Sequence, residues 1–169
     1  MCVNLARAGT VPSQVSYDFL NHVLNPLLVR QDHILASRMT DISDQVTGTH
    51  LGGAKIGGDI NGAIVLFPDP MCATGNTLVS ALDYYKKSVA GTASKFVAIH
   101  LIVTPEYLQN VQKHHPDLQV YAVRLDRGLS PAKVLSEEPG KLWNQERGLN
   151  EKQYIVPGGG GLGEIMNNS

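Results

Sequence analysis

Residues 63–77 read AIVLFPDPMCATGNT, and this run indicates the fold class more clearly than any other part of the chain. Its first five residues are apolar without polar alternation, which is typical of a strand buried on both faces in a parallel sheet. A loop of small and hydroxyl-bearing residues follows from Asp69, and a helical stripe of apolar residues begins near Thr77. The run therefore predicts a strand–loop–helix unit of an α/β protein.

The alternation of strands and helices continues on both sides of this unit. Apolar runs predict further strands at Val3–Leu5, His33–Ser37, Lys95–Val103 and Leu118–Val123. Helical spacing predicts an amphipathic helix over 13–24, and the Thr104-Pro105 pair is typical of a helix start. This order predicts a parallel sheet with helices on both faces, in which ligands bind at the carboxyl ends of the strands.

Length, composition and net charge exclude several classes of protein for this chain. A length of 169 residues predicts a single domain over 1–169. Two cysteines, Cys2 and Cys72, exclude a disulfide framework. The net charge of -1 argues against a nucleic-acid binder, and no apolar run approaches the roughly 20 residues that span a membrane. We therefore expect a cytoplasmic protein with reduced thiols.

Two segments depart from the regular alternation. Residues 41–61 are rich in glycine and lack apolar periodicity, which predicts a long flexible loop, in its specific form a glycine-rich hairpin that folds over a site. Residues 127–147 are irregular, with a short helix expected from Ser130-Pro131. The pentapeptides DRGLS (126–130) and ERGLN (146–150) are similar, and we interpret this similarity as chance.

The loop of residues 69–77 has the chemistry of a ribose-phosphate site. Loop amides and a helix amino terminus bind anions, and Gly75 allows close approach of the backbone. Thr74 and Thr77 add hydroxyl donors, while Asp69 suits vicinal hydroxyls or a metal. The alternative is an ordinary strand–turn–helix junction with capping residues. A Walker loop and a Rossmann fingerprint are both excluded, since the loop has no Gly-Lys-Ser/Thr and a single glycine.

Residues 69–77 resemble the Asp-Pro-Met-Leu-Ala-Thr-Gly-Gly-Ser/Thr loop of the uracil phosphoribosyltransferases. Three further segments resemble that family in the same order. They are the pyrophosphate loop at Leu5–Gly9, the strand end at Ile102–Glu106 and the segment before the base pocket at Gly148–Gly158. The resemblance implies a type I phosphoribosyltransferase core with a C-terminal base-binding hood.

The resemblance also implies a reaction and its participants. Uracil attacks 5-phosphoribosyl diphosphate to give UMP and diphosphate, with Mg²⁺ on the diphosphate, in a homodimer that serves pyrimidine salvage. By the same resemblance Asp69, Arg7 and Arg38 are catalytic, with Arg30 as the alternative to Arg38. The implied phosphoribosyl diphosphate site consists of Arg7, Ala8, Gly9, Arg38, Asp69, Pro70, Met71, Cys72, Ala73, Thr74, Gly75, Asn76 and Thr77. The implied base site consists of Tyr154, Ile155, Gly160, Gly161 and Leu162.

The chain departs from the family at three places. Gly161 stands where the family has its first pocket aspartate. Residues 127–147 form an insertion before the pocket, and most of the family's region ahead of the first loop has no counterpart. These departures keep two alternatives open: a regulatory module that binds a ribose phosphate or nucleotide with weak or no catalysis, or a phosphoribosyltransferase for another base.

The remaining candidates have structural interpretations. None of the six histidines has metal-ligand spacing, and His100 is expected to be a packed strand residue. We expect Cys72 to pack in the core, although a helix amino terminus nearby also suits a reactive thiol.

Overall fold

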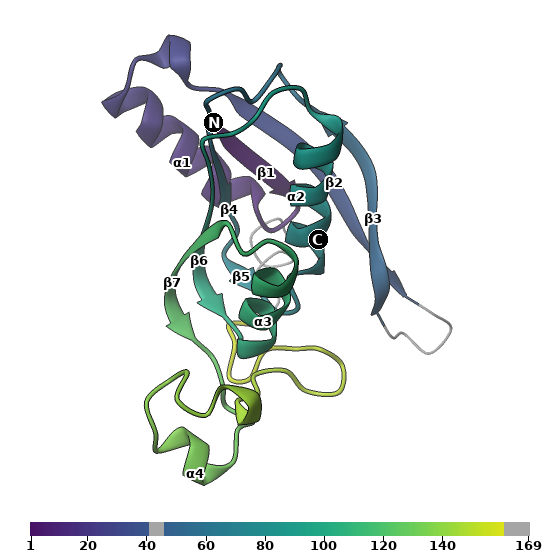
Figure 1. Cartoon of the computed structure of the whole chain (residues 1–169), viewed down its shortest axis with the longest axis vertical. Coiled ribbons are helices and arrows are strands. Elements are labelled where there is room, and N and C mark those ends of the chain that lie inside the picture. Colours follow the sequence, from purple (N-terminus) through teal and green to yellow (C-terminus); the bar gives the residue numbers. More distant parts are fainter. Residues whose placement is uncertain (41–45, 161–169) are drawn as a thin grey trace.

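The computed structural model describes residues 1–40 and 46–160, with the side chains of 37–40 and 46–49 outside that description. Figure 1 shows the arrangement of its elements. Along the chain they are β1 (Cys2–Ala6), α1 (Thr10–Val23), the 3-10 turn η1 (Pro26–Leu28), β2 (Gln31–Thr40), β3 (Val46–Lys55), β4 (Ile64–Pro68), β5 (Met71–Cys72), α2 (Asn76–Ser88), β6 (Lys95–Val103), α3 (Pro105–His114), β7 (Leu118–Leu125), α4 (Ala132–Leu135) and the 3-10 turn η2 (Trp143–Gln145).

The strands form one sheet in the order β3-β2-β1-β4-β6, and both β5 and β7 pair with β6. Every pairing is parallel except β2 with β3. Helix α1 contacts β1 and β4 on one side of the sheet, while α2 and α3 pack together on the other (Figure 1). The predicted α/β class with helices on both faces is confirmed.

The glycine-rich segment contains a strand where a loop over 41–61 was expected. Residues 46–55 form β3, which pairs antiparallel with β2 from His33 opposite Lys55 to Thr40 opposite Val46. The structure thus has the hairpin, the specific form of that prediction. Antiparallel pairing satisfies the backbone amides without an apolar pattern, which explains why periodicity gave no strand signal here. Residues 41–45 lie outside the described residues.

The core lies between the sheet and helices α2 and α3. Phe67 of β4 meets the fully buried Tyr85 of α2 edge to face, with ring centroids 5.7 Å apart. The Tyr85 hydroxyl donates to the buried carboxylate of Asp32 at 2.8 Å, and the Arg30 guanidinium lies 3.0 Å from the same carboxylate. The bond from Tyr85 to Asp32 fixes the carboxyl end of α2 against the amino end of β2. The amino end of α2 therefore lies at the other edge of the sheet, where the parallel strands have their carboxyl ends.

Helix α1 forms as predicted, but its apolar stripe points outward. Val15, Phe19 and Val23, spaced four residues apart, are each more than half exposed, whereas Ser13 is buried. Monomers rarely leave a contiguous apolar row of this kind uncovered. Within the described residues, no helix has the length and apolar character needed to cross a membrane.

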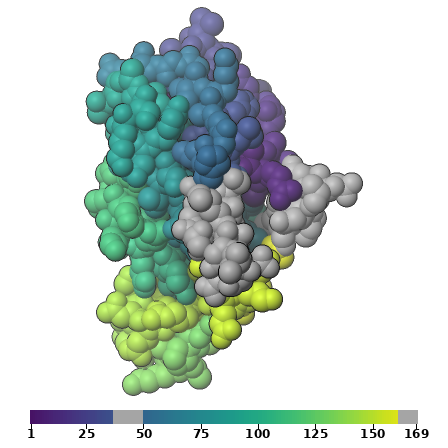
Figure 2. Space-filling view, turned by 90° about the vertical axis from the view of Figure 1, so that its right-hand side faces the viewer, coloured from purple at the N-terminus to yellow at the C-terminus, as the bar shows by residue number. Residues whose placement is uncertain are grey.

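The segment over 127–147 is a compact excursion at one end of the molecule (Figures 1 and 2). The two similar pentapeptides lie side by side at its base, where the Leu129 amide donates to the Arg147 carbonyl at 3.0 Å. Gly128 and Gly148 occupy the same place in the two pentapeptides, and both bond Val156, at 2.9 and 2.8 Å. A side chain at Gly148 would lie 2.1 Å from the Asp126 carbonyl, so glycine is required there.

Candidate functional site

Two loops meet at the carboxyl edge of the sheet. Strands β1 and β4 are parallel neighbours, and Arg7–Gly9 follows the first while Asp69–Thr77 follows the second. Gly9 lies so close to the second loop that a Cβ atom there would be 3.2 Å from the Pro68 carbonyl. The first predicted phosphate-binding segment therefore contacts the end of β4, directly before the second segment begins.

The first half of the Asp69–Thr77 loop is fixed to β6. The Asp69 amide donates to the Ile99 carbonyl at 3.0 Å, and the Asp69 carboxylate accepts from the Met71 amide at 3.2 Å. Pro70 and Cys72 are buried, so they support the loop from the core rather than line its open side. Burial raises the pKa of the Cys72 thiol, which keeps it protonated and agrees with the predicted packing role.

The second half of the loop leads into α2 through Gly75. This residue is the helix N-cap, with φ of 79°, and no side chain caps the helix start. The amides of a first helical turn have no partners inside the helix and carry its positive dipole end. The geometry therefore suits an anion bound where Thr74 and Thr77 also lie.

Substitution of Gly75 by alanine is expected to weaken anion binding as well as stability. The left-handed φ costs a non-glycine residue roughly 1–2 kcal/mol, and the new Cβ would lie 2.8 Å from Cδ2 of Tyr107. Calorimetry with ribose 5-phosphate and urea unfolding measure the two effects. Gly62→Ala is the matched control, because Gly62 also has positive φ but open space around it; equal losses of ligand affinity in both variants would refute a local role of Gly75.

His100 lies directly beneath the loop, buried as the sequence predicts. Its Nδ1 is 2.7 Å from the Asp69 carbonyl oxygen, and its Nε2 is 2.7 Å from the Tyr107 hydroxyl. A carbonyl only accepts, so Nδ1 carries the proton and Nε2 accepts from Tyr107. Burial lowers the pKa of His100 from its ordinary 6.5 to about 4. The ring is therefore neutral at physiological pH.

Acidification should destabilise the fold through His100. The unfolded chain takes up this proton near pH 6.5 and the folded chain only near pH 4, so the stabilisation is complete above pH 6.5 and is lost as the pH falls to 4. The loss amounts to about 3 kcal/mol. Urea unfolding at pH 6.5 and at pH 4 measures the free energy of unfolding. This free energy should fall more in the wild type than in His100→Gln, by about the amount given above. An equal fall in both proteins would contradict a buried, neutral His100.

The arginines predicted for the diphosphate differ in position. Arg7 directly follows β1 and is exposed at the carboxyl edge, and the peptide bond that precedes it is cis. The Arg38 backbone lies in the carboxyl half of β2, opposite Thr49, and its side chain is outside the described residues. Arg30 precedes β2 at the opposite edge, where it bonds Asp32 and the Gly58 and Asp59 carbonyls. Arg30 and the Asp69–Thr77 loop therefore lie at opposite edges of the sheet.

The segment expected to hold a base begins next to the Asp69–Thr77 loop. Gly148 packs against Thr104, whose hydroxyl bonds the Ala73 carbonyl. Ile155 pairs with Leu149 in an antiparallel bridge, and Tyr154 is exposed. Gly160 is the last residue described, while Gly161 and Leu162 lie outside the described residues.

Carboxylates fasten this segment to the body of the protein. The Asp126 carboxylate accepts from the Gly158 amide at 2.7 Å, and the Glu106 carboxylate accepts from the Gly148 amide at 3.0 Å. The sequence predicted no such role for Asp126 or Glu106, although both lie in segments quoted above, and it did not single out Asn110, which bonds the Thr74 carbonyl. Their roles depend on contacts between distant parts of the chain, for which a single sequence has no local signal.

Comparisons with known proteins agree with this geometry. A family model described as uracil phosphoribosyltransferase matches residues 32–142. A curated uracil phosphoribosyltransferase from Bacillus licheniformis is 37% identical over 112 residues, which are 66% of this chain and 43% of the relative. The chain thus spans less than half the length of that relative.

Solved structures show the same fold. The AQ2163 protein from Aquifex aeolicus superimposes with a TM-score of 0.68 at 23% identity, over 96% of this chain and 62% of the other. An adenine phosphoribosyl transferase from Trypanosoma brucei, solved in complex with AMP, pyrophosphate and ribose-5-phosphate, superimposes with a TM-score of 0.55 at 12% identity, over 82% and 60% of the two chains.

Proposed function

Because the chain belongs to the uracil phosphoribosyltransferase family, we propose that it transfers the phosphoribosyl group of 5-phosphoribosyl diphosphate to uracil, giving UMP and diphosphate. The observation that carries this proposal is the Asp69–Thr77 loop, in which a carboxylate and an uncapped helix start lie together at the carboxyl edge of the sheet. A carboxylate suits the ribose hydroxyls, and the helix start suits the 5-phosphate.

The proposed reaction needs positioning and charge stabilisation more than covalent chemistry. Asp69 would orient the ribose, and the amides from Ala73 to Thr77 would bind the 5-phosphate. Arg7 and Arg38 would stabilise the charge that develops on the leaving diphosphate, because guanidinium groups bind phosphate oxygens in pairs. The base would reach the bound sugar phosphate near the contact between Gly148 and Thr104.

Mg²⁺ is part of the proposal as a partner of the substrate. Within the residues that the structure describes, no group of three His, Cys, Asp or Glu side chains forms a metal site. By the family resemblance the ion would be held mainly by the diphosphate oxygens, and Asp69 is the carboxylate of the loop that would lie near it. When bound, the ion would neutralise charge on the diphosphate.

An assay with radiolabelled uracil, 5-phosphoribosyl diphosphate and Mg²⁺ tests the proposal. We expect labelled UMP to form, and uracil to be preferred over other bases in the same assay. Thermal stabilisation by 5-phosphoribosyl diphosphate without UMP would instead support a ribose-phosphate binding module, and transfer to another base would support a different acceptor. The absence of both stabilisation and product would refute all three.

The binding module is the second candidate because Gly161 replaces a family aspartate. If the missing carboxylate limits transfer, Gly161→Asp should raise kcat/KM for uracil by about tenfold, the effect of one hydrogen bond to a charged group. Gly159→Asp is the matched control, since it adds the same charge two residues away. Equal rates in both variants and the wild type would show that this carboxylate is not limiting.

We also propose that the chain forms a homodimer in the cytoplasm. The exposed apolar row of Val15, Phe19 and Val23 supports an assembly of some kind. Light scattering measures the mass in solution, and a value of one chain at all concentrations would refute the dimer.

A further inference from the structure

Side chains beneath the phosphate loop bind its carbonyl oxygens. The Thr104 hydroxyl donates to the Ala73 carbonyl at 2.5 Å, and the Asn110 side-chain amide donates to the Thr74 carbonyl at 2.7 Å. His100 binds the Asp69 carbonyl in the same way. Three carbonyl oxygens of one loop are thus turned towards β6 and α3.

The direction of these carbonyls decides where the loop amides point. In a trans peptide the C=O and the following N–H point in opposite directions, and the peptides after Ala73 and Thr74 are trans. The amides of Thr74 and Gly75 therefore point away from α3, to the side where the first turn of α2 presents its own amides. A peptide flip at either position would place a carbonyl oxygen on that side instead.

Glycine in a loop makes such a flip easy unless something opposes it. A flip of the Thr74–Gly75 peptide turns φ of Gly75, which takes both signs without a steric penalty, so the Asn110 bond to the Thr74 carbonyl supplies the restraint there. The Thr104 bond restrains the preceding Ala73–Thr74 peptide. Thr104 is itself held, because its oxygen accepts from the Tyr107 amide at 3.0 Å as the N-cap of α3. Asn110 also binds Oδ1 of Asn76, the first residue of α2, at 2.9 Å. Both donors are thereby fixed in direction.

We propose that Thr104 and Asn110 are positioning residues for the sugar phosphate: they hold the Ala73–Thr74 and Thr74–Gly75 peptides with their amides towards the 5-phosphate without contacting it. The inference rests on the proposed function, since it concerns the same loop. It assigns a task to α3, a helix that bears none of the ligand-binding residues implied by the family resemblance.

The test removes each donor and measures the affinity for ribose 5-phosphate by calorimetry. Asn110→Leu and Thr104→Val keep the side-chain size, and each should raise Kd by about tenfold, the usual effect of one such hydrogen bond. Thr104→Ser keeps the hydroxyl and should bind within about twofold of the wild type. Gln112→Leu, on the exposed face of the same helix, is the matched control and should also bind as the wild type.

A second readout separates positioning from general structural damage. In the uracil assay, Asn110→Leu should raise KM for 5-phosphoribosyl diphosphate and leave KM for uracil unchanged. Wild-type Kd in both Asn110→Leu and Thr104→Val, at a temperature where both are folded, would overturn the inference; equal rises in both KM values would do so as well. If Asn110→Leu does not fold, the contrast between Thr104→Val and Thr104→Ser decides.

The outcomes also separate this inference from the proposed function. Wild-type protein that binds ribose 5-phosphate but forms no UMP would refute the transfer reaction and leave the calorimetric test of Thr104 and Asn110 in force. Wild-type protein that does not bind ribose 5-phosphate would overturn both.

Discussion

Asp69→Asn is expected to weaken binding of 5-phosphoribosyl diphosphate by about 30- to 150-fold. This loss of affinity corresponds to roughly 2–3 kcal/mol of binding free energy, the contribution of hydrogen bonds that ribose hydroxyls donate to a charged carboxylate. Asparagine keeps one side-chain oxygen, so the bond from the Met71 amide, 3.2 Å long in the structure, can persist. The loss should therefore concern the ligand and not the loop. Calorimetry with the Mg²⁺ complex of the substrate measures it.

The chain contains a matched control for this substitution. Asp59 accepts from the amide two residues later, that of Asn61, at 3.0 Å, in the same local geometry as Asp69 but at the other edge of the sheet. Asp59→Asn should therefore leave the affinity unchanged. An unchanged affinity in Asp69→Asn would refute the assignment of Asp69 to the ribose.

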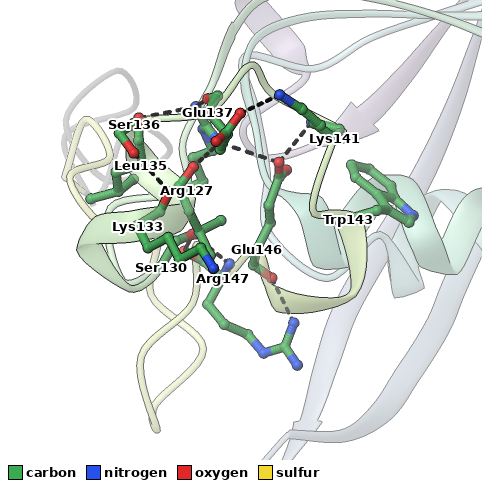
Figure 3. A network of polar contacts seen from close by, with 12 residues as sticks. Arg127, Ser130, Lys133, Leu135, Ser136, Glu137, Lys141, Trp143, Glu146 and Arg147 are labelled. Carbon is green, nitrogen blue, oxygen red and sulfur yellow. Dashed lines mark hydrogen bonds and ion pairs between the residues drawn. The ribbon is translucent and has the colours of Figure 1, made fainter.

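Arg127→Met is expected to destabilise the protein by about 3–5 kcal/mol, the cost of leaving a buried charge without its partner. Glu146 is fully buried, and its Oε1 lies 3.2 Å from the Arg127 guanidinium. Its Oε2 has no hydrogen-bond partner within the described residues. Arg127 also donates to the carbonyl of Val134, within α4, and to that of Glu137, which follows the end of this helix. Figure 3 shows Arg127 and Glu137 in this arrangement.

Urea unfolding measures this loss against two variants. Arg147→Met is the control, because Arg147 is exposed and its side chain donates to the Glu146 carbonyl and not to a carboxylate (Figure 3). The double variant Arg127→Met/Glu146→Leu should recover much of the stability, because it removes the buried charge as well. A loss below about 1 kcal/mol in Arg127→Met, the range of an exposed pair, would contradict a buried ion pair.

Local patterns predicted much of the fold. Strand β6 has the predicted bounds, Lys95–Val103, because an apolar run interrupted only by His100 lies between polar residues. Thr104 caps α3 through its side chain, as the Thr-Pro pair indicates. Such signals act within a few residues, so one sequence contains them.

Features that depend on distant contacts were not predictable in this way. The sequence predicted the apolar stripe of α1, but not that Val15 and Phe19 would face outward. The pairing of residues 126–130 with 146–150 depends on the close approach of Gly148 to the Asp126 carbonyl, which no local pattern reveals. Arg38 was preferred to Arg30 on the sequence, but only the pairing of β2 shows that the two arginines lie at opposite edges of the sheet.

The residues of the candidate site fall into the same two groups: some belong to a local sequence motif, and others depend on contacts between distant parts of the chain. The residues of the Asp69–Thr77 loop could be predicted as a ribose-phosphate site because their order is itself the motif. Asn110 was missed, since a single asparagine on a helix has no distinctive spacing, and its role appears only when α3 packs beneath Thr74.

The central claim is that the Asp69–Thr77 loop binds a ribose phosphate. A crystal structure of the protein with ribose 5-phosphate tests it most directly. We expect the phosphate oxygens on the amides of residues 74–77 and the ribose hydroxyls on the Asp69 carboxylate. A sugar phosphate bound elsewhere, with the loop empty at saturating concentration, would contradict the claim.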